Sequence, residues 1–282
     1  MSALRTLLAE FFDYAGLYPP AGLPLETAAK NYLEYAQGEH GWALGRFILS
    51  ADRLGELRSL VGEDELRRFK LSAIVSNAAD MAAVSEEVEK RSPVDTVEIK
   101  WSMPSKGVIE VPESLTTYLE VELQSQGGDA LDLISGLGVR AKIRMGGVVE
   151  EAFPEPSAVA EMLCALAKRR VRFKATAGLH HPTRSSQPLT YEPKSARVTM
   201  HGFLNLFCAA AVVYFGGETG DAERVLREED RAAWRVDADS VSWRELSWTE
   251  DQIATLRREF FISVGSCSFE EPMRDLEGLG WL

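Results

Sequence analysis

Strand-like and helix-like segments alternate along almost the whole chain, and this alternation restricts the fold more than any other feature. The strand-like segments recur roughly every 22 to 32 residues, the length of one strand with its crossover helix. Intervening helices favour parallel pairing of the strands. Eight such strands are expected, and they predict a closed (β/α)8 barrel of the TIM type. The expected strands cover residues 14–18, 45–50, 69–76, 94–101, 117–124, 140–145, 172–177 and 240–245.

A single α/β barrel domain accounts for all 282 residues. Around it we expect an N-terminal helix over residues 1–13, a long loop or lid over 182–199, and an irregular C-terminal extension over 262–282. The alternative is an open, doubly wound α/β sheet. The early strands, however, are not followed by the Gly-x-Gly-x-x-Gly turn that such sheets often carry.

Composition and charge limit the classes of function. A net charge of -12 and a pI near 5.0 argue against a surface that binds nucleic acid. The longest apolar run, 206–215, is about half of the roughly 20 residues that a membrane span requires. No cleavable leader is recognisable, and Cys164, Cys208 and Cys267 have neither disulfide nor metal-ligand spacing. We therefore expect a cytoplasmic protein with reduced thiols that binds neither nucleic acid nor membranes.

Charged and apolar residues alternate along four strands in the middle of the chain. Side chains at positions i and i+2 share a face, so each of these strands has one apolar and one charged face. In a closed barrel the apolar faces meet the helices and the charged faces enter the lumen. An antiparallel sheet with one face in water would give the same alternation and is the alternative. The charged positions are Glu98, Lys100, Glu120, Glu122, Lys142, Arg144 and Lys174.

Charges inside a barrel must pair or serve a site, because burying an isolated charge costs several kcal/mol. These positions contain one more cation than carboxylates, which suits an anionic substrate. A lysine among other cations releases its proton more readily, and it can then act as a base or form a Schiff base. The leading hypothesis is an enzyme with lyase, aldolase or isomerase chemistry. Lys174 and Lys142 would carry the reaction, and Glu122 and His180 would transfer protons.

The substrate of this hypothesis is a small metabolite with a carboxylate or phosphate group. Arginine can hold such a group with its planar fork, and glycines near the last strands of a barrel often approach phosphates. For each lysine, a structural ion pair is the alternative to a catalytic role. The expected substrate-binding residues are Arg144, Lys100, Glu120, Glu98, His181, His201, Asn205, Gly146 and Gly147.

Two further classes of function stay open. A metal-dependent hydrolase or lyase could use His180, His181 and His201 with Glu122, but neither His-x-His nor His-Glu-x-x-His occurs. We therefore assign no metal ligand, and a divalent metal is the cofactor to consider. A non-catalytic binding or assembly barrel is the other alternative. In that case the apolar helix at 201–215 is either a core helix or a homo-oligomer interface.

Several strings in the sequence resemble a group of bacterial proteins to which no function is assigned. They are Lys-Ile-Arg-Met-Gly-Gly at 142–147, Phe-Lys-Ala-Thr-Ala-Gly-Leu-His-His-Pro at 173–182 and His-Gly-Phe-Leu-Asn at 201–205. The segment 13–20 belongs to the same pattern. The resemblance carries no reaction, so no residue role follows from it.

Overall fold

The computed structural model describes residues 2–100, 112–123 and 128–282. The expected ends of the fourth strand at 101 and of the fifth strand at 124 lie outside these residues, as does residue 1 of the expected N-terminal helix. The fold and the site are described for these ranges.

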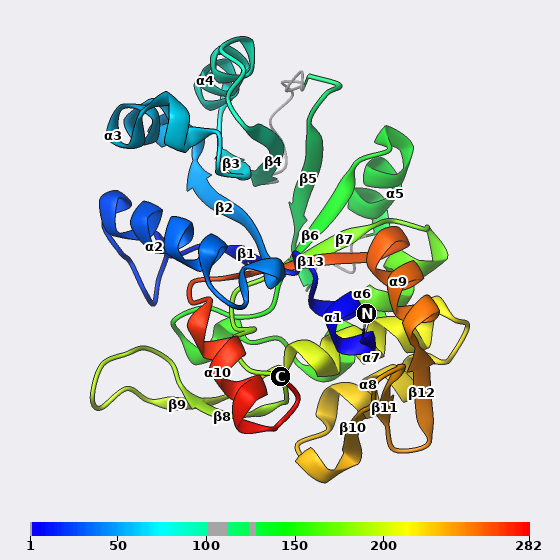
Figure 1. Ribbon diagram of the computed structural model, residues 1–282. Helices are drawn as coiled ribbons and strands as arrows, with labels where there is room; N and C mark the ends of the chain where they lie inside the picture. The colour runs from blue at the N-terminus through cyan, green and yellow to red at the C-terminus, as the bar shows by residue number, and fades with distance from the viewer. Residues whose placement is uncertain (1, 101–111, 124–127) are drawn as a thin grey trace.

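Eight parallel strands close into a barrel in the order β1-β13-β7-β6-β5-β4-β3-β2. Figure 1 shows the helices arranged around this barrel. The prediction of a (β/α)8-like barrel is confirmed, and the open sheet and the antiparallel alternative are wrong. The barrel strands are β1 (Phe12–Tyr14), β2 (Leu44–Ser50), β3 (Leu71–Val75), β4 (Val94–Lys100), β5 (Thr116–Val121), β6 (Arg140–Arg144), β7 (Phe173–Thr176) and β13 (Phe261–Ser266).

Helices connect the strands and cover the outside of the barrel. Local capping explains where some begin: the Asn77 side chain accepts hydrogen bonds from the Ala79 and Asp80 backbone N–H groups in the first turn of α4, and a capping box of Thr249 and Gln252 starts α9. Within the described ranges, no helix is both long enough and apolar enough to cross a membrane. The helices are α1 (Ala3–Leu8), α2 (Leu25–Gln37), α3 (Leu54–Leu66), α4 (Ala78–Glu89), α5 (Gly128–Leu137), α6 (Pro156–Lys168), α7 (Phe203–Tyr214), α8 (Thr219–Arg227), α9 (Glu250–Glu259) and α10 (Glu270–Gly278).

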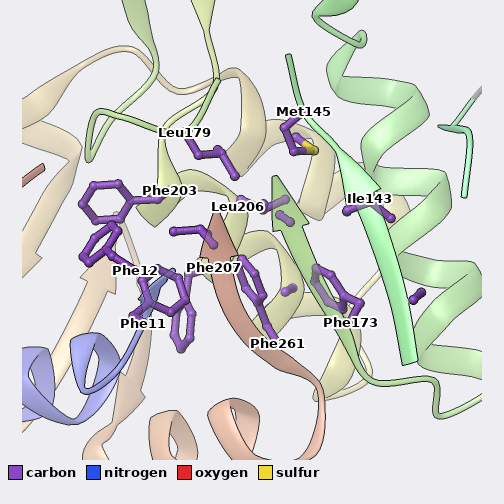
Figure 2. Packing of buried hydrophobic residues seen from close by; sticks show 14 of the residues in the cluster. Phe11, Phe12, Ile143, Met145, Phe173, Leu179, Phe203, Leu206, Phe207 and Phe261 are labelled. Atoms are coloured by element: carbon purple, nitrogen blue, oxygen red, sulfur yellow. The ribbon is translucent and has the colours of Figure 1, made fainter. Parts of the chain in front are cut away.

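The apolar outer faces of the strands form a core with these helices. Phe173 of β7 and Phe261 of β13 stack with ring centroids 4.6 Å apart, and Phe207 of α7 packs on Phe261 at 6.0 Å. Figure 2 shows this aromatic cluster between the strands and α7. Residues 203–213 of α7 are all buried, and the helix contacts α6, α8 and α9. The apolar helix is therefore a core helix of the protein.

The eighth barrel strand is not the one that the sequence predicted. Residues 240–245 contain β11 (Ser240–Trp243), which pairs antiparallel with β10 (Trp234–Val236) and β12 (Leu246–Thr249) in a small separate sheet. Arg244, with a φ of 49°, reverses the chain directly after β11, so this strand pairs locally. Strand β13 closes the barrel instead. The expected irregular extension at 262–282 is therefore wrong, because it holds most of β13 and α10.

Two other segments differ in detail from the prediction. The first strand is β1 at residues 12–14, earlier than the expected 14–18, and the N-terminal helix covers only residues 3–8 of the expected 1–13. The polar segment 182–199 is not a structureless loop. It contains most of a hairpin of β8 (Ser185–Pro188) and β9 (Arg197–Met200), which pair antiparallel.

Candidate active site

The charged faces of the middle strands meet in the lumen because the strands pair in register. Glu120 of β5 lies opposite Lys142 of β6, and Lys142 lies opposite Lys174 of β7. Glu98 enters from β4 and Asp13 from β1, and both carboxylates are buried. The apolar neighbours of these residues face the helices, as the alternation predicts.

Lys174 occupies the centre of the lumen. Its Nζ donates to Asp13 Oδ2 at 2.5 Å and to Glu98 Oε1 at 2.6 Å, and its side chain is 1% exposed. Burial lowers the pKa of Lys174, but the two carboxylates outweigh burial and hold the pKa above its ordinary value. The group is therefore an ammonium at neutral pH. An ammonium has no lone pair for attack on a carbonyl, so this geometry argues against Lys174 as a Schiff-base nucleophile.

Glu98 connects the two lysines. Its Oε1 accepts from Lys174 and from the Ser72 hydroxyl at 2.8 Å, while its Oε2 lies 2.8 Å from Lys142 Nζ. Lys142 and Glu98 therefore form a buried ion pair. Burial raises the pKa of Glu98, but the lysines outweigh burial and hold the pKa well below its usual range. Glu98 is therefore a carboxylate.

The network of ion pairs continues to Arg144, at the C-terminal end of β6. Lys142 Nζ lies 3.0 Å from Glu120 Oε2, and Arg144 Nε donates to Glu120 Oε1 at 3.2 Å. The chain from Asp13 to Arg144 thus contains three carboxylates and three cations. Asp13 was not among the sequence candidates, and it balances the cation that the sequence inventory left over.

A cavity of about 410 Å³ lies over the C-terminal ends of the barrel strands. Active sites of (β/α)8 barrels lie at this end because the strand ends and their loops converge there. Glu98, Lys142, Arg144 and Thr176 line the cavity from the strands. Residues 187–191 of the β8–β9 hairpin line it as well.

A histidine, a thiol and a carboxylate meet at the rim of this cavity. His180 follows β7, Cys267 follows β13, and Glu271 is in the first turn of α10. His180 Nδ1 lies 2.9 Å from Glu271 Oε2, and His180 Nε2 lies 3.7 Å from Cys267 Sγ. Burial lowers the pKa of His180, but Cys267 and Glu271 outweigh burial and raise it to about 10. The imidazole ring is therefore a cation at neutral pH.

Tyr191, from the turn of the β8–β9 hairpin, covers this group. Its hydroxyl donates to Glu271 Oε2 at 3.1 Å and lies 3.8 Å from Cys267 Sγ. Burial and the neighbouring Cys267 and Glu271 raise the pKa of Tyr191, so the phenol keeps its proton and can donate it in a hydrogen bond. The hairpin thus reaches the thiol directly.

The other two candidate histidines have different surroundings. His181 lines the cavity, and its Nδ1 lies 2.6 Å from Asp275 Oδ2 of α10. His201 is buried away from the cavity, and its Nε2 donates to the Pro154 carbonyl at 2.8 Å. Burial lowers the pKa of His201 to about 4, so this ring is neutral.

Asn205, a predicted substrate-binding residue, lies away from the cavity. It is fully buried in α7, where Oδ1 accepts from the Arg184 backbone and Nδ2 donates to the carbonyls of Val225 and Glu228. These three bonds tie α7 to the end of α8 and to the start of the hairpin. The geometry gives Asn205 a structural role.

The remaining candidates divide between the cavity and other places. Gly147 lines the cavity, whereas Gly146 packs under Phe153, whose ring would lie 2.5 Å from an added Cβ atom. Lys100 and Glu122 are exposed at the ends of their strands, and neither lines the cavity. The fold thus brings together only part of the site residues that the sequence predicts.

The histidines do not form a metal centre. Within residues 2–100, 112–123 and 128–282, no group of three or more His, Cys, Asp or Glu side chains is arranged to hold a metal ion. His180, His181 and His201 each have a separate partner, namely Glu271, Asp275 and the Pro154 carbonyl. The metal-dependent alternative therefore has no support from this geometry.

Searches of protein-family models, curated proteins and solved structures find no match to this chain. The geometry of the cavity is therefore the basis for assigning its chemistry.

The sequence did not identify three residues of the rim, Cys267, Glu271 and Tyr191, as functional candidates. Placing β13 correctly would have identified Cys267, because that residue directly follows the eighth strand.

Proposed function

We propose that the chain is an enzyme that converts a small metabolite with a carboxylate or phosphate group in the cavity at the top of the barrel. The observation that carries this proposal is the lining of the 410 Å³ cavity. Cationic side chains from β6 line it, and a titratable histidine lies at its rim. A cavity with a few convergent polar groups is where a barrel binds its substrate.

Arg144 is the group that we assign to the anion. Within the described ranges its ion pair runs through Nε to Glu120, and 52% of the side chain is exposed. The two terminal nitrogens are therefore available to a planar carboxylate or a phosphate, which arginine binds with two parallel hydrogen bonds. Lys142 supplies a second positive charge from the same strand.

The lysines of this proposal act through their charge. Lys174 is held between Asp13 and Glu98 and serves the barrel structure, while Lys142 borders the cavity between Glu98 and Glu120. The Lys142 ammonium is placed to stabilise negative charge that develops on the substrate. Borohydride treatment in the presence of oxo-acids should then leave Lys174 unmodified, and a reduced adduct on Lys174 would contradict this assignment.

Anion binding tests the proposal. The probes are inorganic phosphate and a panel of carboxylates and phosphate esters of two to six carbons, measured by thermal shift and calorimetry. A ligand at 100 times its Kd stabilises the folded state by about 2.7 kcal/mol, which a melting curve detects. At least one member of the panel should bind, and Arg144→Gln should weaken its binding at least ~10-fold, the loss of one charge-assisted contact.

Arg140→Gln is the matched control. Arg140 lies on the same strand and the same face as Arg144, but at the opposite end, where it donates to the Tyr118 hydroxyl. This variant should bind the ligand with an unchanged Kd. The proposal is wrong if no member of the panel binds below ~10 mM, a free energy of about -3 kcal/mol. Equal weakening by both variants would contradict it as well.

A further inference from the structure

At the rim of the cavity, a thiol, a histidine and a carboxylate are arranged in space as they are in enzymes with a cysteine nucleophile. These residues are Cys267, His180 and Glu271. His180 presents Nε2 to the sulfur at 3.7 Å and Nδ1 to the carboxylate at 2.9 Å. In such an arrangement the histidine accepts and returns protons at the nucleophile, and the third residue fixes the ring orientation. Cys267 and Glu271 share the short connection from β13 to the first turn of α10, and His180 reaches them from the end of β7, about 90 positions away in the chain.

We propose that Cys267 is a covalent nucleophile, with His180 as its acid and base and Glu271 as the residue that orients His180. This inference rests on the proposed function, since it assigns a reaction to the same cavity. Cys267 lines that cavity although only 6% of it is exposed. His180 Nε2, 3.7 Å from the sulfur, is placed to take the thiol proton when Cys267 attacks.

The substrate class that fits is an activated acyl compound, such as an ester, thioester or amide, whose acyl part carries an anionic group. The thiolate attacks the carbonyl carbon, a carbon–sulfur bond forms, and the leaving group departs with the proton of His180. Water then attacks the thioester while His180 takes a proton from it. The carbon–sulfur bond breaks, and a carboxylic acid, the thiolate and the protonated His180 result.

Tyr191 has a place in this reaction. Its hydroxyl is 3.8 Å from Cys267 Sγ, so it is in reach of the oxygen on a carbon atom bonded to that sulfur once its single proton turns from Glu271 Oε2 to that oxygen. A donor at this position stabilises the negative charge that develops on the oxygen. Since Tyr191 lies on the hairpin, the lid would supply this donor when it covers the cavity.

Alkylation by iodoacetamide at pH 7, followed residue by residue with mass spectrometry, tests the nucleophile. The full chain contains its own reference in Cys164, which is more exposed than Cys267 and contacts Thr219. Cys267 should react at least ~10-fold faster than Cys164, because reactivity follows the thiolate and not exposure alone. Equal or slower reaction of Cys267 would overturn the inference.

Two variants separate His180 from a histidine outside the cavity. His180→Gln should slow alkylation of Cys267 at least ~10-fold and leave Cys164 unchanged, since it removes the cation beside the sulfur. His40→Gln is the matched control: it alters a histidine that also pairs with a carboxylate of α10, Glu277, so the rate at Cys267 should stay within ~2-fold. Similar effects of the two variants would contradict the role of His180.

The covalent intermediate is tested with p-nitrophenyl acetate and mono-p-nitrophenyl succinate. A burst of p-nitrophenol and an acid-stable acyl group on Cys267 are expected. Cys267→Ser should abolish both, and Cys164→Ser should not. Acylation only at lysines would overturn the inference. Cys267→Ser should still bind the anions that bind to the original protein, so a failure of the thiol chemistry is distinguishable from a failure of the proposed function.

Discussion

Replacing Lys174 by methionine removes the cation that two buried carboxylates share. Asp13 and Glu98 are each 1% exposed, so neither can be solvated after the change. Asp13 keeps its bonds from the Ser263 hydroxyl and the Arg46 backbone, and Glu98 keeps Ser72 and Lys142. Breaking a buried pair by removing one partner costs about 3–5 kcal/mol, and these remaining bonds keep the expected loss within that range.

Urea unfolding at pH 7 measures this loss, and Lys70→Met is the matched control. Lys70 lies 2.6 Å from Glu10, a similar distance, but the two side chains are 48% and 57% exposed. An exposed pair contributes at most about 1 kcal/mol. Adding Asp13→Asn to Lys174→Met should recover part of the stability, because it removes an uncompensated charge. Equal losses for Lys174→Met and Lys70→Met would refute the argument that burial makes this pair important.

Three other predictions concern the buried polar groups. The pKa of His180 is raised in the folded state, so the charged ring contributes its full stabilisation below pH ~6.5 and loses it as the pH rises through about 10. The difference in the free energy of unfolding between the original protein and His180→Gln should therefore shrink between pH 7 and 10.5. The pKa of His201 is lowered in the folded state, so the unfolded state binds more protons between pH ~6.5 and about 4. The urea midpoint should therefore fall as the pH is lowered from ~6.5 to about 4. In His201→Gln it should fall less steeply. Asn205→Ala should lower the free energy of unfolding by about 2–4 kcal/mol and leave the Kd of bound anions unchanged, because its three hydrogen bonds are structural.

The fold could be predicted from the sequence because seven strands recur at a regular spacing, and α2 to α6 lie between most of them in the described residues. The eighth strand could not, since β11 has the stronger alternation of apolar and polar residues, Val241 and Trp243 against Ser240 and Ser242. Strand β13 carries Ser263 and Gly265 in its middle, which weakens the β pattern. Only closure of the barrel distinguishes the two segments.

The lumen charges could be predicted from alternation, but their roles depend on neighbours that the sequence does not place. Lys174 appeared as a candidate nucleophile because Asp13, 161 positions away, was not known to reach it. Cys267 appeared as an ordinary reduced thiol because His180, 87 positions away, was not known to reach it. Proximity of residues far apart in the chain is the information that only the folded barrel supplies.

We propose that one cavity joins an anion-binding end at Arg144 to a reactive thiol at Cys267. The most direct measurement is the rate of Cys267 alkylation by iodoacetamide in the presence of an anion that binds the protein. Saturating anion should slow alkylation of Cys267 but not of Cys164, and Arg144→Gln should remove this protection at the same anion concentration. A bound anion that leaves the rate at Cys267 unchanged would contradict the claim.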